Sequence, residues 1–428
     1  MFVALLEPAA PAKPGLRRAL MLCLVLLGSS AHANDALTID RALRLAQDRS
    51  RQLVAQDAVA SAAREMAVAA GQLPDPTLKA GINNLPVDGA DRFSLTRDFM
   101  TMRSVGVMQE FTRADKRKAR AARFDREADF ADAGRAVALT TLRRDTAMAW
   151  LDRYYQQRTR DVLVAQRDEA RLQIEAADSA YRGGRGSQAD VFAARSAVAQ
   201  IEDRIAQADR QIAAAGIQLA RWIGEAAQQP LAAPPAIDTV RFDAADLETQ
   251  LSHHPQIELM ARQEEVALAE AEIARTNRKA DWSAELMYSQ RGSAYSNMMS
   301  INLSVPLQVD RKNRQDRDLA AKLAMAEQMR AQREEATRNH VAEVRNWLQE
   351  WRSNRDRLLR YDATLTPLAT ERTRAAIAAY RGSGGPLGAV LEARRIEIDT
   401  RMERLRLEMA TASLWAQLEY LIPHRSSE

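Results

Sequence analysis

The sequence predicts a mainly α-helical protein with a small β-sheet portion, built from two copies of one pattern. The chain has 428 residues, of which 5% are aromatic and 28% charged, a composition typical of long helices. A Tyr-Arg-Gly sequence occurs at Tyr181 and again at Tyr380, each time just before a new helical segment. Each copy follows two short segments of alternating polar and apolar residues and one very long polar helix. Two halves of one pattern usually share one architecture, so we expect an internal duplication.

The N-terminus has the features of a signal peptide. Basic residues precede an apolar run over 19–27, and small residues at 31–33 form a cleavage site. We therefore expect residues 1–33 to be removed, by the Sec route rather than the twin-arginine route, and the mature chain to begin at Asn34. The single cysteine, Cys23, lies in the apolar run, which excludes disulfides and thiolate metal sites from the mature chain.

The mature chain is nearly neutral and has no transmembrane helix in its sequence pattern. Residues 1–33 carry three basic and one acidic side chain, so their removal lowers the net charge from +4 to +2. This small charge gives no reason to expect a nucleic-acid partner. No later apolar run approaches the ~18 residues that a membrane-spanning helix needs. An exported chain of this kind is periplasmic, secreted or part of an outer-membrane β-barrel.

Repeat 1 is expected over 34–228 and begins with a helix. Thr38 is the predicted N-cap, and the helix is expected to run to Gly71, shortly before two prolines. Alternation of apolar and polar residues over about 77–83 and 102–111 predicts two strands joined by a polar loop.

The rest of repeat 1 is a helical hairpin. A helix is expected over about 115–181, which at 1.5 Å per residue is on the order of 100 Å, far longer than a globular domain is wide. A Gly-rich tip at 181–189 leads into the next helix. The apolar residues of that helix recur three and four apart, as in a coiled-coil seam. They are Val191, Ala194, Val198, Ile201, Ile205, Ala208, Ile212, Ala215, Leu219 and Trp222.

A linker over 229–246 leads to repeat 2, which we expect over 247–421, with a short tail at 422–428. Repeat 2 contains the same kinds of element in the same order. These are a helix from about Pro255 to Asp281, strands at about 282–290 and 299–307, a long helix over about 312–380, a tip hairpin at 380–388 and a last helix whose seam includes Ile398, Met402, Leu405, Met409, Ala412 and Ala416.

Four short strands cannot close within one chain, because the smallest bacterial barrels have about eight strands and an open sheet leaves unpaired edges. Three copies would supply about twelve strands, an even number. The strands alternate as in a barrel with lipid outside and water inside. Trp282 and Tyr288 lie near the two ends of one lipid face, where an aromatic girdle belongs. A soluble four-stranded sheet on a coiled-coil stalk is the alternative interpretation.

The helices favour a hollow assembly. Their apolar stripes are narrow and rich in alanine, and much of the remaining surface is Arg, Glu, Asp and Gln. A solid bundle would need a wider apolar face. The pattern therefore indicates a hollow helical barrel that, together with the strands, forms a water-filled conduit.

Over residues 37–421 the sequence resembles the TolC-type outer-membrane efflux factors. The resemblance rests on the duplicated order of elements, on the opening Leu-Thr-Ile-Asp-x-Ala-Leu at Leu37, and on the Tyr-x-x-Gly hairpins followed by Asp-Val or Val-Leu-x-Ala. Pro-Asp-Pro-x-Leu at Pro74 and Gln-Glu-Phe at Gln109 resemble the heavy-metal branch of that family. The resemblance implies a homotrimeric channel whose 12-stranded β-barrel in the outer membrane is continuous with a trimeric α-barrel in the periplasm. The tip of the α-barrel would meet a periplasmic adaptor and an inner-membrane pump of the RND type. It implies no catalytic residue and no cofactor.

The resemblance also assigns roles at the periplasmic tips. Asp190 falls where the family has an aspartate that hydrogen-bonds across the closed aperture, Tyr380 falls on its tyrosine partner, and Glu392 on one of two acidic positions at the entrance. Ala389 replaces the other acidic residue, and Gly385 replaces a gate arginine. A simpler role for Asp190 is that of an N-cap at the hairpin.

The tips themselves are predicted to contact the adaptor, although arginines there can also serve solubility alone. Their glycines are expected because positive φ is costly for other residues. The predicted docking residues are Arg182, Gly183, Gly184, Arg185, Gly186, Arg381, Gly382, Ser383, Gly384 and Gly385.

Methionines gather near two of the strands. Thioethers suit Cu(I), but methionine also fills irregular interiors, and both interpretations stay open. The residues concerned are Met100, Met102, Met108, Met298 and Met299. No pair of histidines has the spacing of metal ligands on one helix face.

Other functions compete with a metal-efflux channel. The sequence has no P-loop, dinucleotide fingerprint or Gly-x-Ser-x-Gly elbow, which argues against an enzyme and places the energy source in another protein. Drug efflux and type I protein secretion use a duct of the same architecture. An exported coiled-coil scaffold or adhesin is the alternative from a different class of protein.

Overall fold

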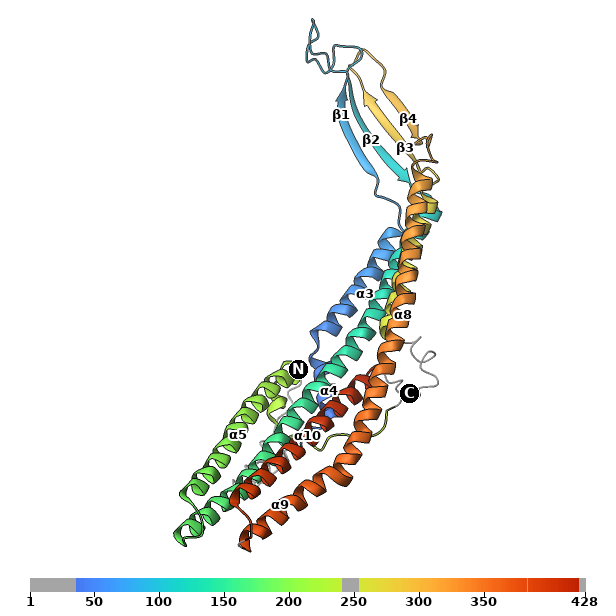
Figure 1. The fold of residues 1–428 in the computed structure, drawn as a ribbon. Helices are drawn as coiled ribbons and strands as arrows, with labels where there is room; N and C mark the ends of the chain where they lie inside the picture. The colour runs from blue at the N-terminus through green and yellow to red at the C-terminus, as the bar shows by residue number, and fades with distance from the viewer. Residues whose placement is uncertain (1–35, 241–253, 383, 423–428) are drawn as a thin grey trace, which may run out of the picture.

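The computed structural model describes residues 36–240, 254–382 and 384–422. A four-stranded sheet forms one end of an elongated molecule, and the tips of two helical hairpins form the other (Figure 1). The predicted signal peptide, the predicted start of repeat 2 at Leu247 and Ser383 lie outside the described residues.

The first helix of repeat 1 is two helices, α2 (Ile39–Arg49) and α3 (Arg51–Ala70). The prediction of one continuous helix is therefore wrong. Thr38 is the N-cap of α2, as predicted, and its hydroxyl accepts a hydrogen bond from the Arg41 N–H at 3.2 Å. Ser50 has extended backbone angles and caps α3 by accepting from the Leu53 N–H at 3.3 Å. A serine that serves as N-cap restarts the helix at that point.

The sheet is an antiparallel meander in the order β1-β2-β3-β4. Its strands are β1 (Thr77–Asn83), β2 (Met102–Phe111), β3 (Trp282–Gln290) and β4 (Met298–Ser304). β4 ends three residues before the predicted limit. Ser304 pairs with Ser283 near the start of β3, and Pro306 beyond it has no N–H to donate to a ladder.

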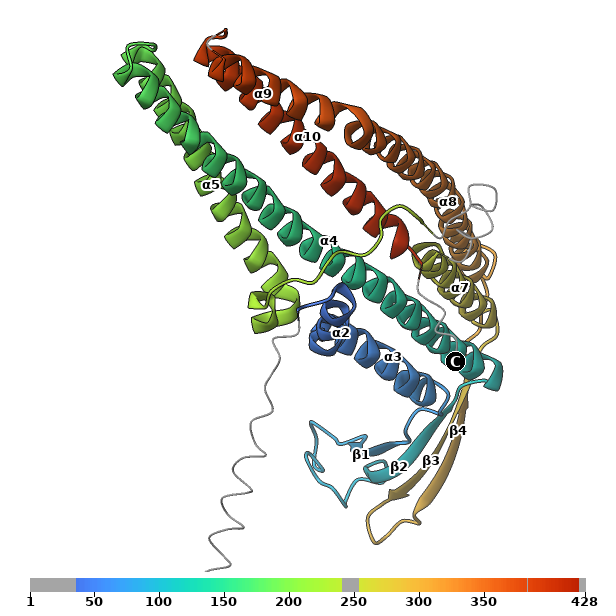
Figure 2. The ribbon, with the colours of Figure 1, turned by 90° about the horizontal axis from the view of Figure 1, so that it is seen from below.

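The helical region consists of two hairpins and the helices that support them. The first hairpin is α4 (Ala114–Arg182) with α5 (Gln188–Ile223), followed by a short 3₁₀ turn, η1 (Gly224–Gln228). Repeat 2 contributes α7 (Pro255–Thr276), α8 (Gln315–Arg360), α9 (Thr366–Arg381) and α10 (Leu387–Glu419). α7 ends at Thr276, so its predicted extension to Asp281 is wrong. α4 and α10 lie side by side along the helical region (Figure 2).

The long helix predicted over 312–380 is interrupted. A π-helical turn, η2 (Tyr361–Leu365), separates α8 from α9. Pro367 lies in the first turn of α9. Proline lacks an N–H and its ring clashes with the carbonyl four residues earlier, so the chain must depart from regular α-helical bonding there. A wider turn is one way to absorb this.

The main hydrophobic core lies midway along the molecule, where α2, α4, α8 and α10 meet. Trp150 on α4 is fully buried and its indole N–H donates to the Leu37 carbonyl at 3.0 Å. Trp351 on α8 does the same for repeat 2, donating to the Ile237 carbonyl at 3.1 Å. In each repeat a tryptophan of the long helix thus binds the backbone of the segment that precedes the first helix of that repeat. Toward the tips the buried clusters are smaller and follow the predicted seam of α5.

Candidate functional site

One face of the sheet is apolar and uncovered. Leu78 on β1 is 71% exposed and Ile301 on β4 is 78% exposed, although both lie within regular strands. Cross-strand pairing puts these residues on a continuous apolar face. Its other apolar members are Ala80, Ile82, Val105, Val107, Phe111, Trp282, Ala284, Leu286, Tyr288, Met299 and Leu303. An exposed apolar face of this kind marks a surface that another molecule or a membrane covers.

The opposite face of the sheet is polar. Lys79 on β1 reaches across β2 to Glu285 on β3, with Nζ 2.5 Å from Oε2. Asn83 donates to the Ser104 hydroxyl at 2.9 Å. Gly106 lies between the two pairs, and a Cβ at this position would be 2.7 Å from the Leu286 carbonyl oxygen, so only glycine fits. The two faces therefore differ as the lipid and water sides of a membrane strand do.

The two predicted girdle aromatics, Trp282 and Tyr288, lie on the apolar face at opposite ends of β3. Trp282 stacks on Phe111 of the paired strand, with ring centroids 4.1 Å apart. The Tyr288 hydroxyl accepts a hydrogen bond from Asn297 at 2.7 Å. Each ring thus combines an exposed apolar surface with a polar or aromatic neighbour at a strand end.

The five methionines of the predicted cluster do not form one group. Met102, Met108 and Met298 lie on the polar face, but Met299 lies on the apolar face and Met100 precedes β2. The pairing adds Met287, which was not among the five predicted methionines. Met287 could have been identified from the sequence, because it occupies a polar-face position in the alternation of β3.

The two hairpin tips have the same local construction. In repeat 1 a Cβ on Gly186 would lie 3.2 Å from the Cβ of Ala180, and in repeat 2 a Cβ on Gly385 would lie 3.3 Å from the Cβ of Ala379. Both glycines are six residues beyond that alanine, which precedes the hairpin tyrosine. These glycines permit close packing at the turn.

Positive φ occurs at Gly184, where it is +68°. Gly183 and Gly382 are helix C-caps with φ of −81° and −77°. The expectation of positive φ is therefore wrong for Gly183 and Gly382, and also for Gly186 and Gly385. The Gly384 N–H closes its turn by donating to the Ala379 carbonyl at 3.0 Å.

The arginines of the tips are exposed. Arg182 forms an ion pair with Asp178 on its own helix at 2.6 Å. Arg185 and Arg381 lie beside the turns, one on each hairpin, and both are exposed. These three arginines thus place exposed cations at the hairpin tips.

Asp190 is not the N-cap of α5; Ser187 is. The Ser187 hydroxyl accepts from the Asp190 N–H at 3.2 Å, and the Asp190 carboxylate accepts from the Ser187 N–H at 3.0 Å and its hydroxyl at 2.8 Å. The backbone hydrogen bond from Ser187 is the largest cause that lowers the pKa of Asp190. The carboxylate is therefore ionised and held within its own hairpin.

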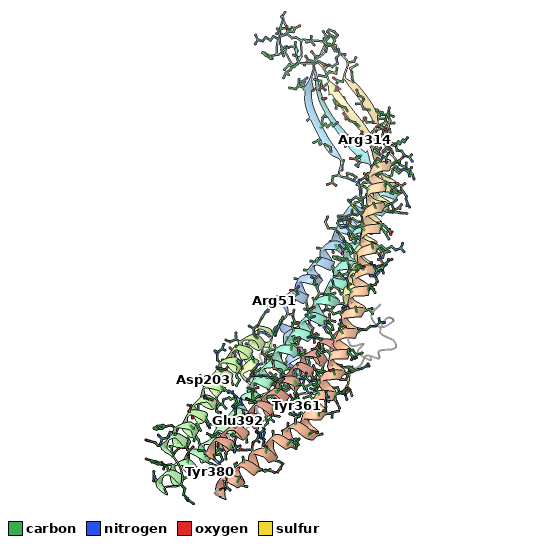
Figure 3. All side chains as sticks on the ribbon, viewed as in Figure 1. Arg51, Asp203, Arg314, Tyr361, Tyr380 and Glu392 are labelled. Atoms are coloured by element: carbon green, nitrogen blue, oxygen red, sulfur yellow. The ribbon has the colours of Figure 1, made fainter. Side chains whose placement is uncertain are left out.

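Tyr380 packs against the buried cluster of the tips, which includes Val191, the residue after Asp190. The predicted partners thus lie at the same end of the molecule on different hairpins, and the described contacts of Asp190 are with Ser187. Glu392 forms a bidentate pair with Arg395, with contacts of 2.7 and 3.0 Å, which lowers the pKa of the glutamate. Tyr380 and Glu392 both lie in the hairpin region (Figure 3).

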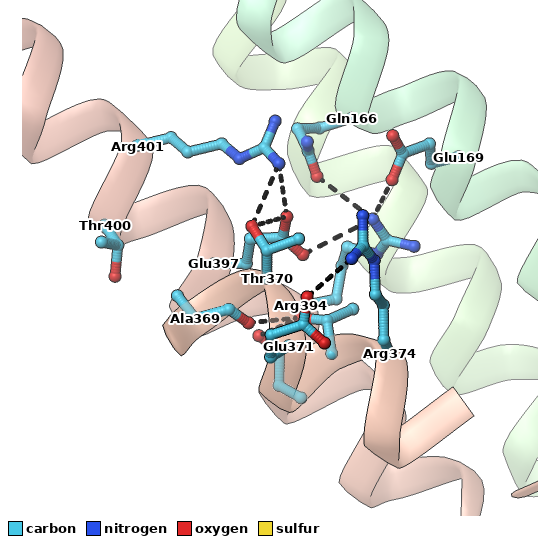
Figure 4. A network of polar contacts seen from close by, with 12 residues as sticks. Gln166, Glu169, Ala369, Thr370, Glu371, Arg374, Arg394, Glu397, Thr400 and Arg401 are labelled. Atoms are coloured by element: carbon cyan, nitrogen blue, oxygen red, sulfur yellow. Dashed lines mark hydrogen bonds and ion pairs between the residues drawn. The ribbon is translucent and has the colours of Figure 1, made fainter. Parts of the chain in front are cut away.

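A buried charge network links the two hairpins above the tips (Figure 4). Arg394 on α10 donates to Glu169 and, at 3.4 Å, to Gln166, both on α4. Glu397 is only 2% exposed and accepts from Arg401 at 2.7 Å and from Thr370 on α9 at 3.1 Å. This network was not predicted from the sequence. It could have been suspected, because Arg394 lies four residues before Ile398 and so places a charge on the apolar seam of α10.

Glu392 and Arg395 also line a groove of about 410 Å³ between α5 and α10. Within the described residues no helix has the length and apolar character needed to cross a membrane. The same residues contain no group of three or more His, Cys, Asp or Glu side chains that could hold a metal ion.

No family model and no curated protein matches the sequence. Solved structures do match the fold. The outer-membrane channel OprN superposes with a TM-score of 0.73 at 14% identity, covering 90% of this chain and 89% of its own. The outer membrane protein VceC from Vibrio cholerae gives a TM-score of 0.73 at 18% identity, covering 90% of this chain and 95% of VceC. CusC, whose structures concern folding and transmembrane channel formation, gives a TM-score of 0.75 at 15% identity, covering 90% of this chain and 92% of CusC. The chain therefore has the fold of solved outer-membrane channel proteins.

Proposed function

We propose that the protein is the outer-membrane channel of a TolC-type tripartite efflux system. Three copies form one conduit, with the sheets in the outer membrane and the helical hairpins in the periplasm. A periplasmic adaptor contacts the tips, and an inner-membrane pump of the RND type supplies the work. The protein itself is not an enzyme. The fold shared with the outer-membrane channels OprN and CmeC supports this proposal.

The uncovered apolar face of the sheet is the observation that carries the proposal. Ile301 and Leu78 are more than two-thirds exposed within regular strands, at an energetic cost in water that lipid would remove. The other face holds a Lys79–Glu285 ion pair and small polar residues, which suits a water-filled interior. A soluble scaffold or adhesin would need a second layer to cover the apolar face.

The edges of the sheet support a trimer. Within the part of the chain that the structure describes, β1 and β4 each have a neighbour on one side only, which leaves two unpaired edges in one sheet. Pairing β1 of one copy with β4 of the next satisfies both. Three copies give about twelve strands, within the range of bacterial barrels.

The class of transported substrate is a separate part of the proposal. We propose heavy-metal ions, because Pro74-Asp75-Pro76 and Gln109-Glu110-Phe111 resemble the metal branch. Drug efflux and type I secretion are the alternatives. Growth of a deletion strain on graded copper, silver, zinc, cobalt and cadmium, beside dyes and antibiotics, separates them. Sensitivity restricted to metals and restored by the wild-type gene supports metal efflux, whereas sensitivity to organic compounds alone overturns it.

Fractionation tests the location and the assembly. We expect the protein in outer-membrane fractions as a heat-modifiable trimer on gels of unboiled samples. A scaffold or adhesin would instead be released by salt or found as a soluble species. Glu285→Gln is a useful companion variant, because it leaves the apolar face intact and should not change the fractionation.

A further inference from the structure

Three methionines lie along one diagonal of the polar face. Met108 on β2 is opposite Glu285 on β3, and Met287 lies two residues farther along β3 on the same face. Met287 is opposite Ser300 on β4, and Met298 lies two residues before Ser300, again on the same face. The pairing therefore places Met108, Met287 and Met298 on three neighbouring strands, each a diagonal neighbour of the next.

Diagonal neighbours on adjacent strands are about 7–8 Å apart, within reach of long side chains. Methionine has three rotatable bonds, so two sulfur atoms can turn toward one ion between them. No side chain separates the first pair, because Gly106 lies beside Met287. A Cβ on Gly106 would be 3.1 Å from the Cβ of Met287.

These methionines do not fill an apolar interior. Their neighbours on the same face are Ser104, Ser289 and Ser300, and Met298 is 47% exposed. Apolar side chains on a face whose other members are mostly polar or charged are unfavourably exposed to water. A binding role explains why thioethers rather than hydroxyls occupy this diagonal.

The charges on this face favour a cation. Its charged side chains are Lys79, Glu285 and Glu110, since Arg103 points to the opposite face. Lys79 is neutralised by Glu285 at 2.5 Å, and Glu285 lies directly opposite Met108. The three groups together carry one net negative charge, so a monovalent cation beside Met108 meets no unpaired positive charge.

We propose that this diagonal binds a soft monovalent metal ion, Cu(I) or Ag(I), with Met287 as the shared ligand of two adjoining two-thioether sites. Thioethers are soft neutral ligands that select such ions over Zn²⁺, Mg²⁺ and other harder cations. Met108 completes one site and Met298 the other. Because thioethers carry no proton near neutral pH, binding requires no proton release. That the sites line a conduit rests on the proposed function; the binding itself does not.

Silver titration of the full-length protein in detergent tests the proposal. Calorimetry in a chloride-free nitrate buffer should detect Ag(I) binding to the wild type. Met287→Leu keeps the volume of the side chain and removes the shared sulfur, so the affinity should fall by about tenfold or more. Met299→Leu, one residue from Met298 on the opposite face, is the matched control and should bind silver as the wild type does.

NMR of ¹³C-labelled methionine methyl groups tests silver binding in the wild-type protein, so the result does not depend on whether a variant folds. On addition of Ag(I), the signals of Met108, Met287 and Met298 should shift, and that of Met299 should not. Unshifted signals, or Met287→Leu binding silver as tightly as the wild type, would overturn the proposal. Either result would leave channel activity, measured by conductance, unaffected, so the two proposals fail separately.

Discussion

Asp190 and Ser187 cap the start of α5 reciprocally. The Asp190 carboxylate accepts from the Ser187 N–H at 3.0 Å and from its hydroxyl at 2.8 Å, while Ser187 Oγ accepts from the Asp190 N–H at 3.2 Å. Both capping bonds to the carboxylate are made by Oδ2, so the cap occupies one of its two oxygens and Oδ1 could bond across an aperture. The capping role and the proposed gating role can therefore be separated by substitution.

If Asp190 and Tyr380 form one latch, Asp190→Ala and Tyr380→Phe should each raise channel leakage, and the double variant should leak no more than either alone. Ser187→Ala is the control, because it weakens the cap by about 1 kcal/mol yet keeps the carboxylate. Leakage can be measured as the uptake of a large antibiotic by cells. Unchanged leakage in all three latch variants would rule out the latch.

Arg185 is predicted to contact the adaptor. It lies exposed at the tip of the first hairpin, and among the described residues no ion pair to it is formed. A contact with a partner protein would give this charge a role. Arg185→Glu should leave trimer assembly intact but abolish resistance in growth assays, whereas Arg185→Lys should retain most of it. Failure of the glutamate variant to assemble would contradict a docking role.

Because the ring of His254 is buried, we expect the free energy of unfolding to fall on acidification. Its ring is buried and lies 4.2 Å from the ring of His340, and burial first and His340 second lower its pKa from 6.5 to about 4. The unfolded chain binds the proton more readily, so the free energy of unfolding should be highest above pH 6.5. It should fall by an amount on the order of 2 kcal/mol as pH drops toward 4.

His254→Asn provides the control for this pH dependence. The histidine caps α7 by accepting from the Gln256 N–H at 3.2 Å, and asparagine can cap in its place. Thermal unfolding of this variant should depend less steeply on pH between 4 and 6.5. An equal slope in the two proteins would exclude His254 as the titrating group.

The buried network predicts an asymmetry between single and double substitutions. Arg394→Met removes one of the two cations beside Glu397, which is 2% exposed and keeps Arg401 at 2.7 Å, and should lower the unfolding free energy by about 1–2 kcal/mol. Adding Glu397→Leu should restore most of the loss. Arg374→Met breaks an exposed pair with Glu371 and should change stability by less than about 1 kcal/mol. Equal losses from Arg394→Met and Arg374→Met would contradict this account.

The two faces of β4 can be compared at adjacent residues. Ile301→Arg places a charge on the apolar face and should cost about 2–4 kcal/mol of membrane insertion, while Ser300→Arg faces the polar side and should insert normally. Outer-membrane fractionation of the two variants measures this. Normal insertion of both would contradict a lipid-facing role for the apolar side.

The sequence pattern was sufficient for the sheet and for the coiled-coil seam, because both depend on regular repetition. Alternation in β1 and β3 identified the two faces, and Val191 and Leu219 on α5 are buried as the seam requires. The interruptions were harder to predict. Ser50 restarts a helix through a local hydrogen bond, and the turn before Pro367 depends on how the chain accommodates one missing N–H.

The polar sites were the least predictable. Arg394 meets Glu397 three residues along its own helix and Glu169 on α4, and the contact with α4 is one that no local period encodes. Met287 joins Met108 and Met298 only through strand pairing, and pairing across repeats cannot be read from one strand alone. The N-cap was assigned to Asp190 instead of Ser187 for a local reason, because both residues are good capping types and Asp190 completes the capping box that Ser187 begins.

Single-channel conductance of the purified full-length protein in planar lipid bilayers tests the central claim most directly. The account predicts discrete, long-lived conducting steps from the trimer, and none from an Ile301→Arg preparation that fails to insert. Folded wild-type trimer that adds to the bilayer without any conductance would contradict a channel and favour a scaffold.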